Sequence, residues 1–574
     1  MTETHWFERP EVSAVLEKRL SGFLAGYRQN IALLGPESVG KTAFLKRFLR
    51  RYAADAAPLI IYLEIQEGEN LAEWAGRFIE TLLRAVIRVE NADGAPSALA
   101  DLLCSSTPSL PQTSALAEKL LCLAEERKSA EELFSQLWDL PQIVTQETGL
   151  PCLLVVDEFH RLSRLRVKDP FQKLGQKIMV QGGTMYLLVS SEPQMARQIL
   201  REGLSLLFGQ FEIVEMGPLD SASSLRTMRS VLAGGEADPF LEYLLVELTQ
   251  GYPAYLDLLL QGLGGRPLPR FAEDREREVI LLLERLLLDP ASAWRHRFES
   301  RLKVLPVHRS RRAQLQVLIA VASGCHRVPQ IAHTLERNRP QVLAALKVLE
   351  QSGLVLKQGG FYRISDKFFR LWLMTAYPIL QGTALSDLEQ GRSKFRRAAG
   401  AWIAKAREAM HRSLEEQSIA FIRQWAGEFV EVEQKRILLP RLERVAAVSI
   451  GAGRPVIAAH PKNGQGKSWL WVLWAGVLEE AQAREVAQEL SGPAFREYHK
   501  VVAGAQPVEV NARLVLQQAK IRVWDLEQLN HLLDLYGLMP IPLQTPLQPP
   551  LASTIDVPTE DRTPASDLWI ERAT

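Results

Sequence analysis

The chain has 574 residues, of which 47% are hydrophobic and 24% charged, and its formal net charge is +1 at pH 7. This length excludes a single core and predicts three or four domains, while the balanced charge excludes a global attraction to nucleic acid or to acidic partners. Four cysteines without a C-x-x-C pair disfavour a disulfide scaffold and a zinc site, and no run predicts a secretory signal or a membrane span, so we expect a cytoplasmic protein.

The first apolar run, Ile31–Leu34, is followed by a segment that fits the pattern G-x-x-x-x-G-K-[ST]. Its residues are Gly35, Pro36, Glu37, Ser38, Val39, Gly40, Lys41 and Thr42. The two glycines allow backbone N–H groups to approach phosphate oxygens, Lys41 can reach the β- and γ-phosphates, and the Thr42 hydroxyl can bind Mg²⁺. Apolar residues at helical spacing follow, so strand, loop and helix occur in the order of an ATP-binding P-loop. A structural turn without a ligand is the alternative.

Two later apolar runs, Leu153–Val156 and Met185–Val189, end in polar residues. Asp157 follows the first run and can hold the Mg²⁺ shell through water, while Glu158 can polarise the attacking water as a general base. Ser190 follows the second run and can sense the γ-phosphate or orient the water. Solvated strand ends and a turn-forming serine are the alternatives.

Residues 1–220 alternate strand and helix patterns. Leu59–Leu63 predicts a further strand, and the polar residues 86–115 predict a surface excursion. This alternation predicts an α/β domain, a three-layer P-loop ATPase core with a parallel sheet. Residues 221–300 are then helical, with Leu-rich amphipathic runs.

Residues 301–375 predict a winged helix-turn-helix domain. Helical runs at 313–323, at 328–335 and from Pro340 precede an alternating segment around a Gly-Gly pair, which predicts a hairpin. The third helix of such a domain can enter a DNA major groove. The candidate contacts are Arg337, Arg339, Gln341 and Lys347.

The alternative is a packing or protein-docking module, because four polar residues are ordinary for a solvated helix face. A basic segment directly upstream favours DNA, since its cations can neutralise phosphates. Against one acid, Glu299, it carries Arg295, Arg297, Arg301, Lys303, Arg309, Arg311 and Arg312.

Together these segments resemble the archaeal-type ATPases of the STAND and AAA-like branch of P-loop proteins, over about residues 5–375. The segment Trp6–Leu20 is similar to the family's hydrophobic-Gly-Arg-Glu opening, with Glu8 in place of the glycine. Gly251-Tyr252-Pro253 matches its G-x-P lid motif, and Tyr362–Leu373 resembles the segment that closes its winged helix.

The resemblance implies that residues 221–300 form a helical lid over the nucleotide. It also implies that Arg9 contacts the base of ATP and that Pro253 lies against it. It identifies no arginine finger, for which Arg197 and Arg201 are the candidates.

Residues 390–540 resemble a restriction-endonuclease-like α/β domain, with strands at Val445–Ile450, Val456–Ala459 and Trp469–Trp474. An active domain of this kind holds a metal with an acid on one strand and an E-x-K on the next, and these strands carry no such carboxylates. We therefore expect a degenerate domain without nuclease activity. A basic stretch at its start can bind phosphate or form a solvated helix face: Arg392, Lys394, Arg396, Arg397, Lys405 and Arg407.

Residues 541–574 are rich in Pro, Thr and Ser and predict a disordered tail, in which Leu568–Ile570 is a candidate docking peptide. The whole chain predicts a Mg²⁺-ATP switch whose slow hydrolysis resets coupling among core, lid and winged helix. Its output is ATP-controlled binding of double-stranded DNA or, alternatively, recruitment of a protein partner through the C-terminal domain or tail. An ATP-dependent homo-oligomer is compatible with both outputs, and a metal-dependent nuclease is the least favoured function.

Overall fold

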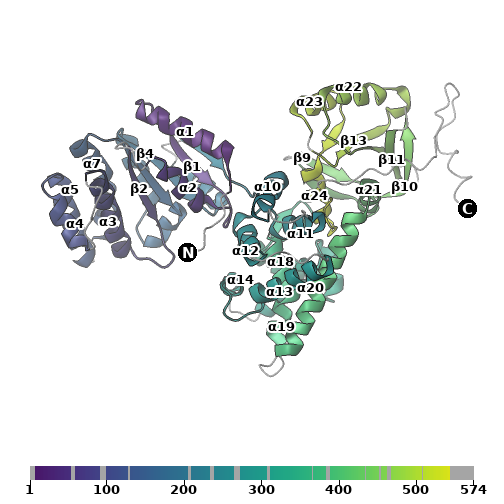
Figure 1. Ribbon diagram of the computed structural model, residues 1–574, viewed down its shortest axis with the longest axis horizontal. Helices are drawn as coiled ribbons and strands as arrows, with labels where there is room; N and C mark the ends of the chain where they lie inside the picture. The colour runs from purple at the N-terminus through teal and green to yellow at the C-terminus, as the bar shows by residue number, and fades with distance from the viewer. Residues whose placement is uncertain are drawn as a thin grey trace, which may run out of the picture. The chain divides into compact units, whose positions relative to one another are not determined.

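The computed structural model describes residues 7–52, 58–90, 98–126, 129–204, 209–232, 238–263, 272–306, 310–364, 366–382, 388–432, 435–450, 454–461, 467–506 and 508–542. The chain forms two compact units, Met1–Thr227 with Gly251–Leu258 and Met228–Gln250 with Leu259–Thr574 (Figure 1). The predicted tail from residue 543 onward, with Leu568–Ile570, lies outside the described residues. Within the described part of the chain, no helix is long and apolar enough to cross a membrane.

The first unit is built on five parallel strands in the order β2-β3-β4-β1-β5. Their bounds are Asn30–Leu34 (β1), Leu59–Glu64 (β2), Cys152–Asp157 (β3), Thr184–Ser190 (β4) and Phe211–Glu215 (β5). Every residue of β1, β3 and β4 is buried, as expected for apolar runs in the middle of a parallel sheet. The predicted α/β class with a parallel sheet is confirmed, and β4 lies between β1 and β3.

Helices cover both faces of this sheet. α1 (Pro10–Leu24) and α2 (Lys41–Arg50) pack on one face against side chains such as Ile31 and Val155. α3 (Leu71–Glu90) packs on the opposite face against Leu34 and Val156, because successive side chains of a strand point to opposite faces. The remaining helices of this unit are α4 (Leu99–Ser106), α5 (Pro111–Glu126), α6 (Ala130–Leu137), α7 (Leu140–Thr148), η1 (Phe159–Leu165), α8 (Pro170–Val180), α9 (Pro193–Gln198) and η2 (Ile199–Gly203).

The expected surface excursion at residues 86–115 is wrong. Residues 86–90 form the end of α3, residues 98–115 contain all of α4 and the start of α5, and residues 91–97 lie outside the described residues; Leu102, Leu103 and Leu110 are buried in the same core as α3. Polar residues such as Asp101, Ser105 and Gln112 lie on the outward faces of these helices, whereas Ser106, Thr113 and Ser114 are buried with the apolar side chains.

Two helices contain a boundary between the units, α10 (Ser221–Val231) and α12 (Pro253–Leu263). The helices that follow in the second unit are α11 (Pro239–Thr249), α13 (Ala272–Leu287), α14 (Ala293–Lys303), α15 (Arg311–Ala322), α16 (Val328–Thr334), α17 (Arg339–Gln351), α18 (Lys367–Thr375), α19 (Tyr377–Gly382), α20 (Leu388–His411) and α21 (Leu414–Ile422). The segment predicted as a lid, 221–300, is thus divided between the units: residues 221–227 and the G-x-P part, 251–258, are grouped with the sheet, and the rest with the second unit.

Helices α15, α16 and α17 are followed by a short antiparallel hairpin, β6 (Leu356–Gln358) and β7 (Phe361–Arg363). Asn338 caps α17 by accepting a hydrogen bond from the Gln341 N–H at 3.0 Å, and a proline lies in its first turn. The elements therefore occur in the order expected for residues 311–366.

The last part of the second unit contains a mixed sheet in the order β10-β11-β12-β13-β14. Its strands are β10 (Leu442–Ile450), β11 (Arg454–Pro461), β12 (Ser468–Trp474), β13 (Tyr498–Gly504) and β14 (Arg522–Trp524). The first three run antiparallel and the last three parallel. One face packs with α21 and α24 (Leu526–Leu535), and the other with α22 (Glu480–Glu489) and α23 (Val510–Gln518). Ile541, predicted to begin the tail, is buried against α24, where it pairs with Asn530.

The β6–β7 hairpin packs on this last part of the chain. A Cβ on Gly359, in the hairpin turn, would lie 2.4 Å from the Phe429 carbonyl oxygen of β8 (Glu428–Val432), which pairs with β9 (Lys435–Leu439). Phe361 of β7 belongs to the same hydrophobic cluster as the sheet, with its ring centroid 5.0 Å from that of Tyr536. This close contact requires glycine at the turn and fixes the hairpin to β8.

Candidate functional site

The glycine-rich loop between β1 and α2 has the backbone that a phosphate cradle needs. Ser38 and Gly40 adopt positive φ angles of 71° and 85°, and a Cβ on Gly35 would lie 2.1 Å from the Met216 carbonyl oxygen. Lys41 is 5% exposed, and its Nζ donates to the Gly35 and Pro36 carbonyls at 2.8 and 3.0 Å. The ammonium group thus lies inside the curve of the loop, where phosphate oxygens can replace those carbonyls.

Burial lowers the pKa of Lys41, and the nearby carboxylates of Glu158, Asp157 and Glu37 partly oppose that shift. The Thr42 hydroxyl, directly after the loop, donates to the Asp157 carboxylate at 2.7 Å, so the end of β3 lies beside the loop. β4 separates β1 from β3, so this meeting depends on the strand order and not on the distance along the chain.

Asp157 is fully buried at the carboxyl end of β3. Its carboxylate accepts hydrogen bonds from the Thr42 hydroxyl at 2.7 Å, from the Glu158 N–H at 3.0 Å and from the Tyr62 hydroxyl. Burial, with Asp157 beside it, raises the pKa of Tyr62. The structure therefore brings together the two predicted metal ligands and adds Tyr62 of β2, which sequence reasoning placed in a strand and gave no role.

Glu158 adopts a left-handed conformation with φ 57°, and its side chain is held at the end of β4. Its Oε2 accepts hydrogen bonds from the Ser191 N–H at 3.1 Å and the Ser191 hydroxyl at 2.8 Å. The Ser190 hydroxyl instead lies 2.9 Å from His160 Nδ1, while its carbonyl accepts from the Gly35 N–H at 3.2 Å. The side chain of Ser191, which sequence reasoning gave no role, therefore holds the predicted base, and the role of Ser190 at the γ-phosphate or the water stays a prediction.

Arg9 and Pro253 contact residues of the loop. The Arg9 guanidinium donates to the Val39 and Pro218 carbonyls, each at 3.2 Å, and burial lowers its pKa. Pro253 is in van der Waals contact with the Cβ position of Gly40, at 3.8 Å. Both residues that the resemblance assigned to the base of ATP are therefore beside the loop.

Gly251 makes the approach of Pro253 possible. Its φ is +71°, and a Cβ there would lie 1.9 Å from the Leu219 carbonyl oxygen. The Leu219 N–H donates to the Gly251 carbonyl at 2.8 Å. Only glycine fits this turn, which explains the first residue of the G-x-P motif in physical terms.

The residues fit the requirements of Mg²⁺. This cation prefers oxygen ligands and is commonly held by one or two carboxylates together with substrate phosphates and water. The Thr42 hydroxyl and the Asp157 carboxylate provide such oxygens 2.7 Å apart, next to the loop. Among the described residues there is no group of three or more His, Cys, Asp or Glu side chains that could hold a metal by itself.

The predicted DNA contacts lie in the second unit, away from these residues in the chain. Arg339, Gln341 and Lys347 are exposed on α17, whereas the Arg337 guanidinium donates to the Gln316 side chain at 2.6 Å. Part of the basic segment upstream is engaged internally: Arg295 pairs with Glu299 at 2.9 Å, and Arg301 with Asp366 at 2.6 Å. These cations are less available to phosphates than the sequence alone indicated.

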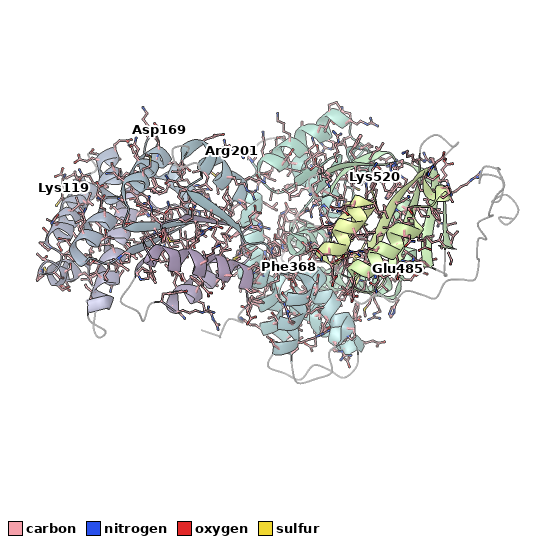
Figure 2. The ribbon with its side chains drawn as sticks, turned by 90° about the horizontal axis from the view of Figure 1, so that it is seen from above. Lys119, Asp169, Arg201, Phe368, Glu485 and Lys520 are labelled. Atoms are coloured by element: carbon pink, nitrogen blue, oxygen red, sulfur yellow. The ribbon has the colours of Figure 1, made fainter. Side chains whose placement is uncertain are left out.

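The second basic stretch, on α20, is also partly neutralised. Arg396 and Arg392 approach Glu284 of α13 at 2.6 and 3.5 Å, and Arg407 pairs with Glu276 of the same helix. Of the arginine-finger candidates, Arg197 pairs with Glu215 and Arg201 is exposed (Figure 2).

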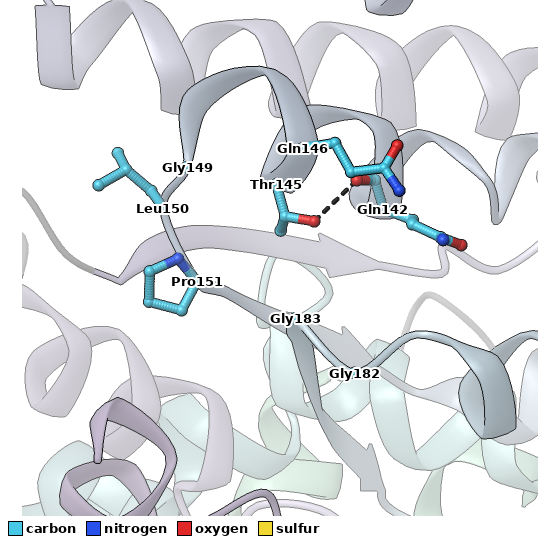
Figure 3. Close-up of a pocket in the computed structure, with 8 residues that line it drawn as sticks. All are labelled: Gln142, Thr145, Gln146, Gly149, Leu150, Pro151, Gly182 and Gly183. Atoms are coloured by element: carbon cyan, nitrogen blue, oxygen red, sulfur yellow. Dashed lines mark hydrogen bonds between the residues drawn. The ribbon is translucent and has the colours of Figure 1, made fainter. Parts of the chain in front are cut away.

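Two surface pockets of the first unit do not fit a nucleotide. One pocket, of about 450 Å³, is lined by Thr145, Pro151 and Gly183 among other residues (Figure 3). The Thr145 hydroxyl donates to the Gln142 carbonyl, with a distance of 2.7 Å between the oxygens. This pocket has no ionisable lining side chain and lies where β3 and β4 begin, whereas ligands of parallel α/β sheets bind at the carboxyl ends of strands. The other, of about 580 Å³, is lined by several glutamates, including Glu67 and Glu73, which would repel phosphates.

No family model and no curated protein matches the chain. Among solved structures it is similar to a Walker-type ATPase of Pyrococcus abyssi, with 20% sequence identity, coverage of 64% of this chain and 96% of that chain, and a TM-score of 0.43. It is also similar to the ORC2 protein of Aeropyrum pernix in ADPNP and ADP complexes, with 15% identity, 70% and 97% coverage and a TM-score of 0.40. A third is Cdc6p from Pyrobaculum aerophilum, with 13% identity, 68% and 94% coverage and a TM-score of 0.31. At these identities and TM-scores, function must be inferred from the geometry of this chain.

Proposed function

We propose that the first unit binds ATP with Mg²⁺ and hydrolyses it slowly. The observation that supports this function best is the convergence of Lys41, Thr42, Asp157 and Glu158 at one end of the sheet, although they come from two segments more than 100 residues apart. The combination of a cationic loop, a buried carboxylate beside a hydroxyl and a second carboxylate held at the end of β4 is suited to phosphoryl transfer to water.

Each residue has a distinct role in the proposed reaction. Lys41 exchanges its bonds to the loop carbonyls for bonds to the β- and γ-phosphates, and Thr42 and Asp157 hold Mg²⁺. The cation, when bound, neutralises charge on the phosphate oxygens. Glu158 orients the attacking water and accepts its proton, while Arg9 and Pro253 bind the base.

Nucleotide binding can be tested by titrating the protein with a fluorescent ATP analogue in the presence of Mg²⁺. Lys41→Ala is expected to weaken binding by about 10- to 100-fold, since hydrogen bonds to charged groups contribute about 1.5–3 kcal/mol. Lys18→Ala removes an exposed lysine of α1 in the same unit and serves as the matched control. Equal affinities for the two variants would contradict the proposed site.

We propose that the nucleotide state of the first unit controls binding of double-stranded DNA. The DNA would bind to a winged helix formed by α15–α17 and the β6–β7 hairpin. The supporting observation is that Arg339, Gln341 and Lys347 are exposed on α17. The hairpin packs on β8, so α17 would carry most of the contact. α12 begins at Pro253, beside the loop, and continues into the second unit. One helix therefore connects the proposed nucleotide site to that unit along the chain.

The alternative output is a protein partner at the C-terminal sheet or tail, with an ATP-dependent homo-oligomer compatible with either output. The neutralised cations of α14 and α20 favour this alternative, because they reduce the charge available to DNA. The strand order of the C-terminal sheet is compatible with a degenerate restriction-endonuclease-like domain, and β11 and β12 contain no acidic residue, so we propose that it does not cleave DNA.

A further inference from the structure

His160 lies directly behind the proposed general base, in the 3-10 helix η1. Its side chain is 1% exposed, and its Nδ1 is 2.9 Å from the Ser190 hydroxyl and 3.3 Å from Glu158 Oε2. Its other nitrogen, Nε2, lies 3.6 Å from the exposed carboxylate of Glu192. One ring nitrogen therefore joins the proposed base to the end of β4.

The 3.3 Å contact between Nδ1 and Glu158 Oε2 indicates where the imidazole proton lies, because the hydrogen bond between Nδ1 and the Ser190 hydroxyl fits either tautomer. Burial lowers the pKa of His160 to about 4, so the ring is neutral near pH 7 and carries one N–H. A carboxylate can only accept, so a bare Nδ1 at 3.3 Å from Glu158 would be repelled, whereas an Nδ1–H is attracted. Ser190 fits this tautomer: its hydroxyl accepts from His160 and from the Glu192 N–H at 3.0 Å, and donates to the Glu192 carbonyl at 3.4 Å.

Ser190 and Ser191 connect Glu158 to the phosphate loop. Ser191 holds the carboxylate through its N–H and its hydroxyl, and the carbonyl of Ser190 accepts the Gly35 N–H of the loop at 3.2 Å. The backbone of Glu158 is in the left-handed region, which persists in a non-glycine residue when its surroundings fix it. Among the described interactions, the Glu158 carboxylate contacts Ser191, directly after β4, and His160. Of these two residues, His160 is the fully buried one.

We propose that His160 is a positioning residue for Glu158, which fixes the carboxylate toward the attacking water through the Nδ1–H. This role rests on the proposed ATP hydrolysis. His160 contacts neither nucleotide nor metal in this proposal, so its loss should slow the chemical step and leave nucleotide binding nearly unchanged. A purely structural histidine would instead affect stability and binding together.

The test compares variants that keep or move the polar atom. His160→Asn retains an amide nitrogen near the position of Nδ1, and His160→Gln places its amide nearer to that of Nε2. Glu192→Gln, which changes only the contact to Nε2, is the matched control. Single-turnover ATP hydrolysis, affinity for a fluorescent ATP analogue and thermal unfolding are measured for each variant, alone and combined with Glu158→Gln.

His160→Gln is expected to lower the single-turnover rate constant by about 10- to 100-fold, the effect of a displacement of about 1 Å at a reacting group, with affinity unchanged. His160→Asn should restore much of this loss, and Glu192→Gln should match the unmodified protein. In the Glu158→Gln background His160→Gln should cause no further loss, because the group that it positions is gone.

Two results would overturn the inference while leaving the proposed function intact: normal turnover of His160→Gln when Glu158→Gln is slow, or equal losses from His160→Gln with and without Glu158→Gln. If Glu158→Gln itself turns over normally, the proposed base is wrong and the role of His160 fails with it.

Discussion

Replacing Tyr62 by phenylalanine removes one hydroxyl from the fully buried carboxylate of Asp157 and leaves the ring in place. That carboxylate has two other donors, Thr42 and the Glu158 N–H, at 2.7 and 3.0 Å. A hydrogen bond to a charged group contributes about 1.5–3 kcal/mol, so the free energy of unfolding of the first unit should fall by that amount. At about 2–4 °C per kcal/mol, its unfolding midpoint should fall by about 3–12 °C.

The assay is thermal unfolding of the full chain, followed in the transition that shifts when Mg²⁺ and ATP are added. Tyr52→Phe is the matched control, because Tyr52 packs on the same core and no hydrogen bond of its hydroxyl is recorded among the described residues. The expected result is a clear loss for Tyr62→Phe and little change for Tyr52→Phe. Equal midpoints for the two variants would refute the role given to the Tyr62 hydroxyl.

Three further outcomes are expected. Burial alone would raise the pKa of Asp534, but its neighbouring cations, Lys367 among them, outweigh burial and hold the pKa below its usual value. Asp534 therefore stabilises the folded chain fully above about pH 4, and this stabilisation is lost on further acidification. Denaturant titrations should show Asp534→Asn less stable at pH 7 by about 3–5 kcal/mol and less sensitive to acid than the unmodified chain. Gly251→Ala should weaken binding of a fluorescent ATP analogue, since its Cβ would meet a carbonyl at 1.9 Å; normal affinity would contradict that packing. Arg339→Gln and Lys347→Gln should each reduce the salt dependence of duplex binding by about one unit of log–log slope, and unchanged slopes would favour a protein partner.

The sequence predicted those parts of the site that depend on neighbours in the chain. The loop at 35–42 and the acids after β3 follow from an apolar run and its next residues, and the structure places them together at the carboxyl ends of β1 and β3. The contacts of Tyr62 and His160 could not be derived in this way. They depend on which strands are neighbours and on their register, as in the pairing of Tyr62 with Val155.

The same dependence on long-range contacts explains why the sequence overestimates the positive charge that is available to phosphates. A run of cations such as that on α20 looks available for phosphate when its partners are distant in sequence, yet Arg396 pairs with Glu284, 112 residues earlier. The packing of the β6–β7 hairpin on β8 is also long-range, because Gly359 and Phe429 meet only in the folded chain. Local patterns predicted the hairpin and the basic stretch on α20, but not β8, and tertiary contacts determine which of their faces are exposed.

The most direct measurement is steady-state ATP turnover with Mg²⁺ for the unmodified chain and for Glu158→Gln, together with their affinities for the nucleotide. We expect slow turnover by the unmodified chain, loss of turnover in Glu158→Gln and similar affinities, because Glu158 is held at the end of β4 by Ser191 and is not part of the loop. Turnover that is equal in the two proteins would contradict the assignment of Glu158 as the general base and, with it, the proposed mechanism of hydrolysis.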